Sequence, residues 1–193
     1  MRVKPIAAAA MALALSACFG GAKPPPELFT LTAASTRPVE TPRTAGPGEA
    51  ITVVDPTVPQ ALLTPRVPVY VSPTGIQYVR NAQWVENPGP LFGRLLGETI
   101  AARTGRVVLD PRQYTHDPGV RLTGQLQMFG LDPTRMEAVV VYDAAMISGA
   151  TGVTTNRFEA RVPVAEISAA AVAPALNQAA NQVATDVAEW IGR

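Results

Sequence analysis

The sequence predicts an α+β domain, with a mainly antiparallel sheet of five to eight strands and two principal helices packed on one face. Three observations support this prediction. Apolar residues recur with helical period in residues 88–105 and 168–191, and they alternate with polar residues in 120–128 and 156–164. Asp-Pro pairs, which disfavour helix and start turns, separate the elements. The pairs are Asp55-Pro56, Asp110-Pro111, Asp117-Pro118 and Asp132-Pro133.

The chain begins with the pattern of a signal peptide. Arg2 and Lys4 give a basic start, and Ile6 to Leu15 are ten uninterrupted apolar residues. A bilayer of about 30 Å needs roughly 20 helical residues, so this segment is too short to span it. Ten residues do suit the apolar core of a signal peptide. We therefore interpret residues 1–17 as a signal peptide that is removed.

The sequence Leu15-Ser16-Ala17-Cys18 resembles the lipobox of bacterial lipoproteins. The resemblance implies a diacylglycerol on the Cys18 sulfur, cleavage before Cys18, and an N-acyl chain on the freed amine. Two membrane signals already give stable anchoring, so three acyl chains should hold the protein firmly. Phe19 follows instead of the Asp that retains lipoproteins in the inner membrane. For a Gram-negative host we therefore expect the periplasmic face of the outer membrane.

The mature chain divides into a tether and one domain. Residues 18–26 hold the acylated Cys18 and a Pro-rich stretch, whose eight residues after Cys18 would reach up to about 25 Å in polyproline form. Residues 27–193 suit a single domain with a substantial core. Cys18 is the only cysteine, so its acylation leaves no thiol for a disulfide, thiolate catalysis or a metal.

Charge argues against binding to nucleic acid. The loss of Arg2 and Lys4 from 16 basic residues leaves 14, against 15 acidic residues, for a formal charge of −1. Binding to nucleic acid needs clustered Lys and Arg, and no such cluster is present, which also argues against electrostatic docking on anionic lipid.

Short strands are predicted in the first half of the domain, where runs rich in strand-forming residues lie between turn signals. The turn Ser72 to Gly75 predicts that two of them form a hairpin. The predicted strands are 27–31, 51–54, 67–71, 76–80 and 106–109.

Three longer strands are predicted to form an antiparallel meander in the second half. In 120–128 the even positions, through Met128, are apolar or Gly, and in 156–164 the even positions from Phe158 are apolar. Residues 136–147 are apolar on both faces except at Asp143, which is typical of a central strand. The second apolar face, within 139–147, exceeds what two helices on one side can cover. We therefore expect a contact there, in the form of self-association.

Two helices complete the expected domain. The first begins near Pro88 and ends at Gly105, because Pro suits a first helical turn and Gly a helix end. Its Gly93 and Gly97 are expected to permit close contact with a strand. The second runs from about 168 to 191, with Pro174 expected in its first turn.

No arrangement of residues in the sequence points to catalysis. Motifs for a nucleophile with its base, a metal cluster or a phosphate-binding loop are missing from the sequence. The lone His116 and the acidic residues Asp110 and Asp117 lie in turn-rich stretches, where solvated side chains are the ordinary interpretation. We therefore expect a protein that is not an enzyme and has no cofactor beyond its acyl chains.

Taken in order, the motifs resemble the PqiC-like auxiliary lipoproteins of ABC-type lipid transport systems. The likeness covers nearly the whole mature chain, and Trp84 before the first helix is its most recognisable residue. The family commonly has W-A-E-P-L, whereas here eight residues run from Trp84 to Leu91 and the helix start is displaced. Besides Cys18, the matching motifs are F-T-L at 29–31, I-T-V-V at 51–54 followed by V-P-Q-A-L-L-T-P at 58–65, V-P-V-Y-V at 67–71, and Q-Y-V-R-N-A-Q-W-V-E-N-P at 77–88 running into a helix at 91–104, the long hairpin and the closing helix.

The resemblance implies a non-catalytic periplasmic subunit that meets an MCE-domain protein at the outer membrane, while a permease and an ATPase supply the energy. MCE proteins form rings or tubes, so self-association is expected as well. Trp84, Tyr78 and Arg80 are candidate partner contacts, and a core role for Trp84 is the alternative. Two other functions stay open: a periplasmic lipid carrier with a closed apolar cavity of about 300–1,000 Å³, and an enzyme of envelope metabolism with convergent side chains in a deep pocket.

Overall fold

A computed structural model describes residues 27–36, 42–46, 48–112, 119–149 and 152–192. The signal peptide, Cys18 and the tether lie outside the described residues, as do His116 and Asp117. Predictions about them are therefore not addressed by the fold.

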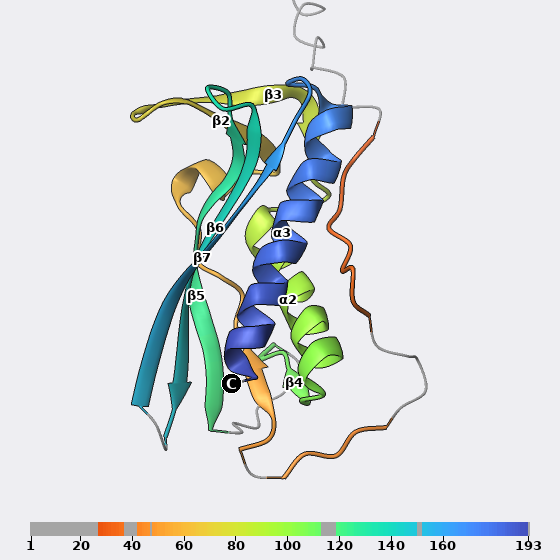
Figure 1. The fold of residues 1–193 in the computed structure, drawn as a ribbon, viewed down its shortest axis with the longest axis vertical. Coiled ribbons are helices and arrows are strands. Elements are labelled where there is room, and N and C mark those ends of the chain that lie inside the picture. Colours follow the sequence, from red (N-terminus) through yellow and green to blue (C-terminus); the bar gives the residue numbers. More distant parts are fainter. Residues whose placement is uncertain (1–26, 37–41, 47, 113–118, 150–151, 193) are drawn as a thin grey trace, which may run out of the picture.

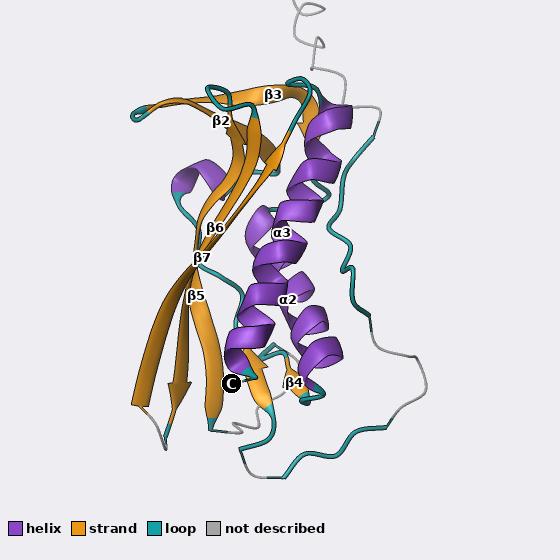
Figure 2. Cartoon of the chain, in the orientation of Figure 1, coloured by secondary structure: helices purple, strands orange, loops and turns teal. Residues whose placement is uncertain are grey.

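The described residues form an α+β domain with two long helices side by side on one face of a seven-stranded sheet (Figures 1 and 2). This confirms the predicted fold class. None of the helices in the described part of the chain is long and apolar enough to cross a membrane. The elements are β1 (Ile51–Val53), the 3-10 helix η2 (Gln60–Leu62), β2 (Arg66–Ser72), β3 (Gly75–Gln83), α2 (Pro88–Thr104), β4 (Val108–Leu109), β5 (Val120–Asp132), β6 (Glu137–Ser148), β7 (Gly152–Pro163) and α3 (Ala169–Ile191).

Strand β5 organises the sheet. One of its edges pairs along its whole length with β6, which in turn pairs with β7, so the predicted antiparallel meander with β6 in its interior is confirmed. Its other edge is shared by β1, which pairs at Arg121 and Leu122, and by β2, which pairs at Leu131. Both of these pairings are parallel, as is that of β1 with β4. The sheet is therefore mixed.

A β-bulge in β5 changes which residues face the helices. The pairing with β6 shifts between Leu126 and Met128, so one extra residue enters the strand. Leu122 and Leu126 are buried on the helix side before the bulge, and Phe129 and Leu131 are buried after it. The period-two alternation predicted through Met128 fails at that residue, because the bulge reverses it and Met128 is only half-buried.

The helix ends follow the sequence signals, with one exception. Helix α2 starts at Pro88 and is closed by Gly105 in the left-handed conformation (φ 73°). Helix α3 is capped by Ser168, whose side chain accepts a hydrogen bond from the backbone N–H of Ala171. The expectation that Pro174 lies in the first turn was wrong, because α3 already begins at Ala169 and the exposed proline ring lies in its second turn.

The segment 27–31 is not a regular strand, contrary to prediction. Only Phe29 pairs, through a single parallel bridge to Trp84: its N–H donates to the Gln83 carbonyl and its carbonyl accepts from the Val85 N–H, both at 2.8 Å. Residues 27–36 then run beside α3 (Figure 1), where side-chain amides of α3 accept hydrogen bonds from their backbone N–H groups. Pairing with helix side chains therefore replaces a strand ladder.

The second face of β6 is largely covered by the chain itself. Val139 is 0% exposed and Val141 is 6% exposed, so the predicted uncovered apolar surface is absent at these two positions. Pro68 and Tyr70 of β2 approach the neighbouring Gly130 of β5 on this face. Ile147, at the far end of the strand, is the part of this surface that stays exposed.

Candidate functional site

A groove of about 350 Å³ lies beside α2, where that helix faces the ends of β1 and β4. Three small residues one helical turn apart, Gly93, Gly97 and Ala101, form its helical wall. The other lining residues are Val53, Asp55, Arg94, Glu98, Val108, Leu109, Asp110 and Arg112.

Gly93 and Gly97 of α2 allow close contact with β4 and with the residues just after β1, as the sequence predicted. A Cβ at Gly93 would lie 2.5 Å from the Asp55 Oδ1, just after β1, and one at Gly97 would lie 3.5 Å from a methyl group of Val108 in β4. The first distance is far below van der Waals contact and the second is ordinary. Gly93 therefore sets the position of the Asp55 carboxylate, whereas Gly97 leaves room.

Alanine at these two glycines is expected to have different effects on stability. In a helix interior Ala is better than Gly by about 1 kcal/mol, so Gly97→Ala should raise the free energy of unfolding by up to about that amount. Gly93→Ala should gain little or lose stability, because the methyl group displaces the Asp55 side chain. Urea unfolding of both variants measures the difference. Equal gains would show that Asp55 does not pack against the helix.

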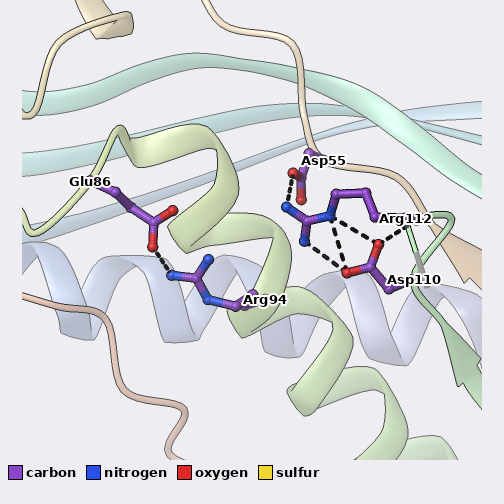
Figure 3. Close-up of polar contacts among 5 residues, drawn as sticks. All are labelled: Asp55, Glu86, Arg94, Asp110 and Arg112. Atoms are coloured by element: carbon purple, nitrogen blue, oxygen red, sulfur yellow. Dashed lines mark hydrogen bonds and ion pairs between the residues drawn. The ribbon is translucent and has the colours of Figure 1, made fainter.

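Arg112 joins two carboxylates at the edge of the groove (Figure 3). Its guanidinium lies 3.1 Å from the Asp55 Oδ2 and 2.7 Å from the Asp110 Oδ2, and its Nε also donates to Asp110. The backbone N–H of Arg112 donates to the Asp110 Oδ1 at 2.8 Å. These hydrogen bonds from Arg112 lower the pKa of Asp110 from its ordinary value.

A second ion pair flanks the groove. Arg94, on the exposed side of α2, pairs with Glu86 in the segment before the helix (Figure 3). Both side chains are 40% exposed or more, so the pair contributes little to stability. The pair adds one positive and one negative side chain to the edge of the groove.

Among the described residues that line it, the groove has charged and polar groups but not the features of a general acid, a metal centre or a closed apolar cavity. General acid catalysis by a carboxyl group requires a raised pKa, whereas the bonds to Arg112 lower the pKa of Asp110. Within the described ranges no three or more His, Cys, Asp or Glu side chains are grouped so as to hold a metal ion. The groove is also open and has a charged rim, so it does not provide the closed apolar cavity that a lipid carrier needs.

The three candidate contact residues of the sequence lie apart from this groove. Trp84 is 1% exposed and its ring meets the edges of Phe29 and Phe129, at centroid distances of 6.3 and 5.4 Å, so its burial fits the core role. The Tyr78 hydroxyl donates to the backbone carbonyl of Ala61 at 3.4 Å. Arg80 is exposed on β3. Binding of a partner by Trp84, Tyr78 and Arg80 stays a prediction.

Two helices on one face of a mixed, mainly antiparallel sheet, with an ion-paired surface groove, define the chain as an α+β domain with a charged surface groove. The family model of ABC-type transport auxiliary lipoprotein components matches residues 29–188. The chain belongs to this family, the PqiC-like family that its motifs predicted.

Solved structures agree with this assignment at the level of the fold. Protein XCC0632 from Xanthomonas campestris, of family DUF330, is similar with a TM-score of 0.71 and 19% identity, over 86% of this chain and 94% of that one. A second crystal structure, of an uncharacterised protein, has a TM-score of 0.65 and 12% identity, over 86% of this chain and 99% of the other. Comparison with curated proteins gave no match.

Proposed function

We propose that the mature chain is a non-catalytic subunit of an MCE-type lipid transport system, anchored through acylated Cys18 to the periplasmic face of the outer membrane. The observation that carries the proposal is the order of two signals in one chain. A lipobox at residues 15–18 is followed, after a short Pro-rich stretch, by a domain of the transport auxiliary lipoprotein family at 29–188. The lipobox supplies a membrane anchor, and the family domain supports a role as an auxiliary component of a transport system.

The groove beside α2 is the surface that we assign to the MCE-domain protein. Charged groups of both signs on a rim fix the register of an interface and its choice of partner more than its affinity. Arg112, held by Asp55 and Asp110, presents such a fixed charge, and Arg94 with Glu86 presents another. The groove lies near β4, away from the end of the molecule that β3 crosses (Figure 1).

Cys18→Ala tests the anchor. Without the thiol, the protein is expected to lose incorporation of radiolabelled palmitate, whereas the wild type is labelled and sediments with the outer membrane on a density gradient. Ser16→Ala is the matched control, because the lipobox accepts small residues at that position, and it should be labelled like the wild type. An unmodified thiol in the wild-type protein, with residues 1–17 still attached, would contradict the anchor.

Purification of the detergent-solubilised wild-type lipoprotein tests the partner. It should retain an MCE-domain protein, and Arg112→Ala should weaken this retention while leaving acylation unchanged. Light scattering of the same preparation measures self-association. Retention of no MCE-domain protein by a fully acylated wild type would contradict the assignment to an MCE system.

A further inference from the structure

Exposed apolar side chains gather at one end of the molecule, which we call the β3 end. Figure 1 shows β3 crossing this end, together with the β2–β3 turn, the connection from β7 to α3 and the start of the described chain. Eight large apolar side chains are exposed among the described residues, and five of them, each 41–50% exposed, lie in these segments or within two residues of them. They are Leu28, Val71, Ile76, Val85 and Ile167.

The anchored part of the chain joins the domain at the same end. The described residues begin at Glu27, and this first segment runs beside α3 and starts at the same end of the molecule as that helix (Figure 1). Only eight residues separate Glu27 from Cys18, and even a fully extended chain of this length spans about 30 Å. An acylated Cys18 therefore keeps the β3 end, rather than the opposite end, close to the bilayer.

The β2–β3 hairpin carries exposed side chains that suit a phospholipid surface. Ile76 and Arg80 are exposed there, and the Arg66 guanidinium lies 4.0 Å from the centre of the Tyr78 ring. In the part of the chain that the structure describes, neither Arg66 nor Arg80 has a carboxylate within ion-pair distance. Tyr is enriched at the membrane interface, and Arg extends its charge toward the headgroups while its stem stays apolar.

We propose that the β3 end rests on the phospholipid surface through its apolar side chains, with Ile76 and Ile167 at the boundary between headgroups and acyl chains. The chain has no basic cluster to dock it electrostatically, so Arg66 and Arg80 only add two contacts to lipid phosphates beside this apolar one. This rests on the proposed anchor at Cys18 and adds the face that the domain presents to the membrane. Each contact is weak by itself. The short tether makes it intramolecular, and an intramolecular contact forms at a high effective concentration of its partner.

The proposal also orients the rest of the molecule. With the β3 end on lipid, the groove beside α2 is held away from the membrane and open to the periplasm. The candidate contacts Tyr78 and Arg80 then meet lipid instead of protein.

Fluorescent labels on the full-length, acylated protein in vesicles of phosphatidylethanolamine and phosphatidylglycerol test the orientation. Acylation occupies the only native thiol, so Ile76→Cys or Ile167→Cys supplies a single site for an environment-sensitive dye. Val153→Cys is the matched control, because Val153 is 65% exposed and is the second residue of β7, a strand that begins at the opposite end (Figure 1). We expect lipids with a spin label near the headgroup to quench positions 76 and 167 about twofold and to leave position 153 unchanged. Arg66→Gln combined with Arg80→Gln should reduce the quenching at position 76.

Flotation of the same vesicles separates this inference from the anchor. If the protein floats with the vesicles while positions 76 and 167 are quenched no more than 153, the inference is overturned and the anchor stands. If the protein does not float, the anchor fails and the inference fails with it. If position 76 becomes shielded only when an MCE-domain protein is added, the β3 end binds protein and the lipid contact is overturned.

Discussion

Replacing Trp84 with alanine is expected to lower the free energy of unfolding by about 3–5 kcal/mol. The side chain is 1% exposed, and its ring lies between Phe29, which ties the N-terminal segment to the domain, and Phe129, near the C-terminal end of β5. Its removal would leave a cavity at the point where three separate segments meet. Urea unfolding followed by far-UV circular dichroism measures the loss, because the signal does not depend on the tryptophan that is removed.

Two further variants make the result specific. Trp190→Ala removes a ring that is only half-buried and packs on Phe158, so its effect should be smaller. Trp84→Phe should cost less than Trp84→Ala, because it keeps apolar bulk and removes the Nε1–H, a buried donor without a partner among the described residues. A Trp84→Ala protein with wild-type stability but no partner binding would contradict the core role and favour the contact role.

Local patterns predicted the elements well because the signals lie within each element. Gly105 can close α2 because glycine adopts the left-handed conformation, and Ser168 can cap α3 because its side chain reaches the first turn. The alternation in β5 failed at Met128, since a bulge depends on the pairing with β6 and not on the strand's own residues. The parallel pairing of β1 with β4 and β5 could not be predicted either, because the pattern of residues within a strand does not indicate which strands it pairs with.

The ion-pair cluster of Asp55, Asp110 and Arg112 is a feature that the sequence analysis did not predict. The sequence analysis interpreted Asp110 as a solvated turn residue, whereas the structure joins Asp110 to Asp55 through Arg112. A signal was present: both Asp55 and Asp110 stand before a proline directly after a short predicted strand. Because β1 and β4 are parallel neighbours, their carboxyl ends meet and bring these residues together. The cluster was unpredictable without the pairing.

Gly130→Val is the second variant with a large expected effect. A Cβ at this position would lie 2.4 Å from the Pro68 carbonyl oxygen and 3.0 Å from the Tyr70 ring, where β2 crosses onto β5. Backbone atoms cannot rotate away, so we expect a loss of about 3 kcal/mol, at the upper end for overpacking. For a chain of this size this corresponds to a melting temperature lower by about 6–12 °C.

Gly149→Val is the matched control for this variant, because nothing lies within 4 Å of the Cβ it adds, and it should melt close to the wild type.

Hydrogen exchange would show which strands lose stability in Gly130→Val. Since β2 joins the sheet through its pairing of Val69 with Leu131, next to Gly130, the amides of β2 and β3 should lose protection before those of β6 and β7. Uniform loss across the sheet, or a melting temperature equal to that of Gly149→Val, would mean that the hairpin is not held to β5 at this crossing. The hairpin bears Ile76, Tyr78 and Arg80, so its attachment at Gly130 also fixes the orientation of the β3 end relative to the groove.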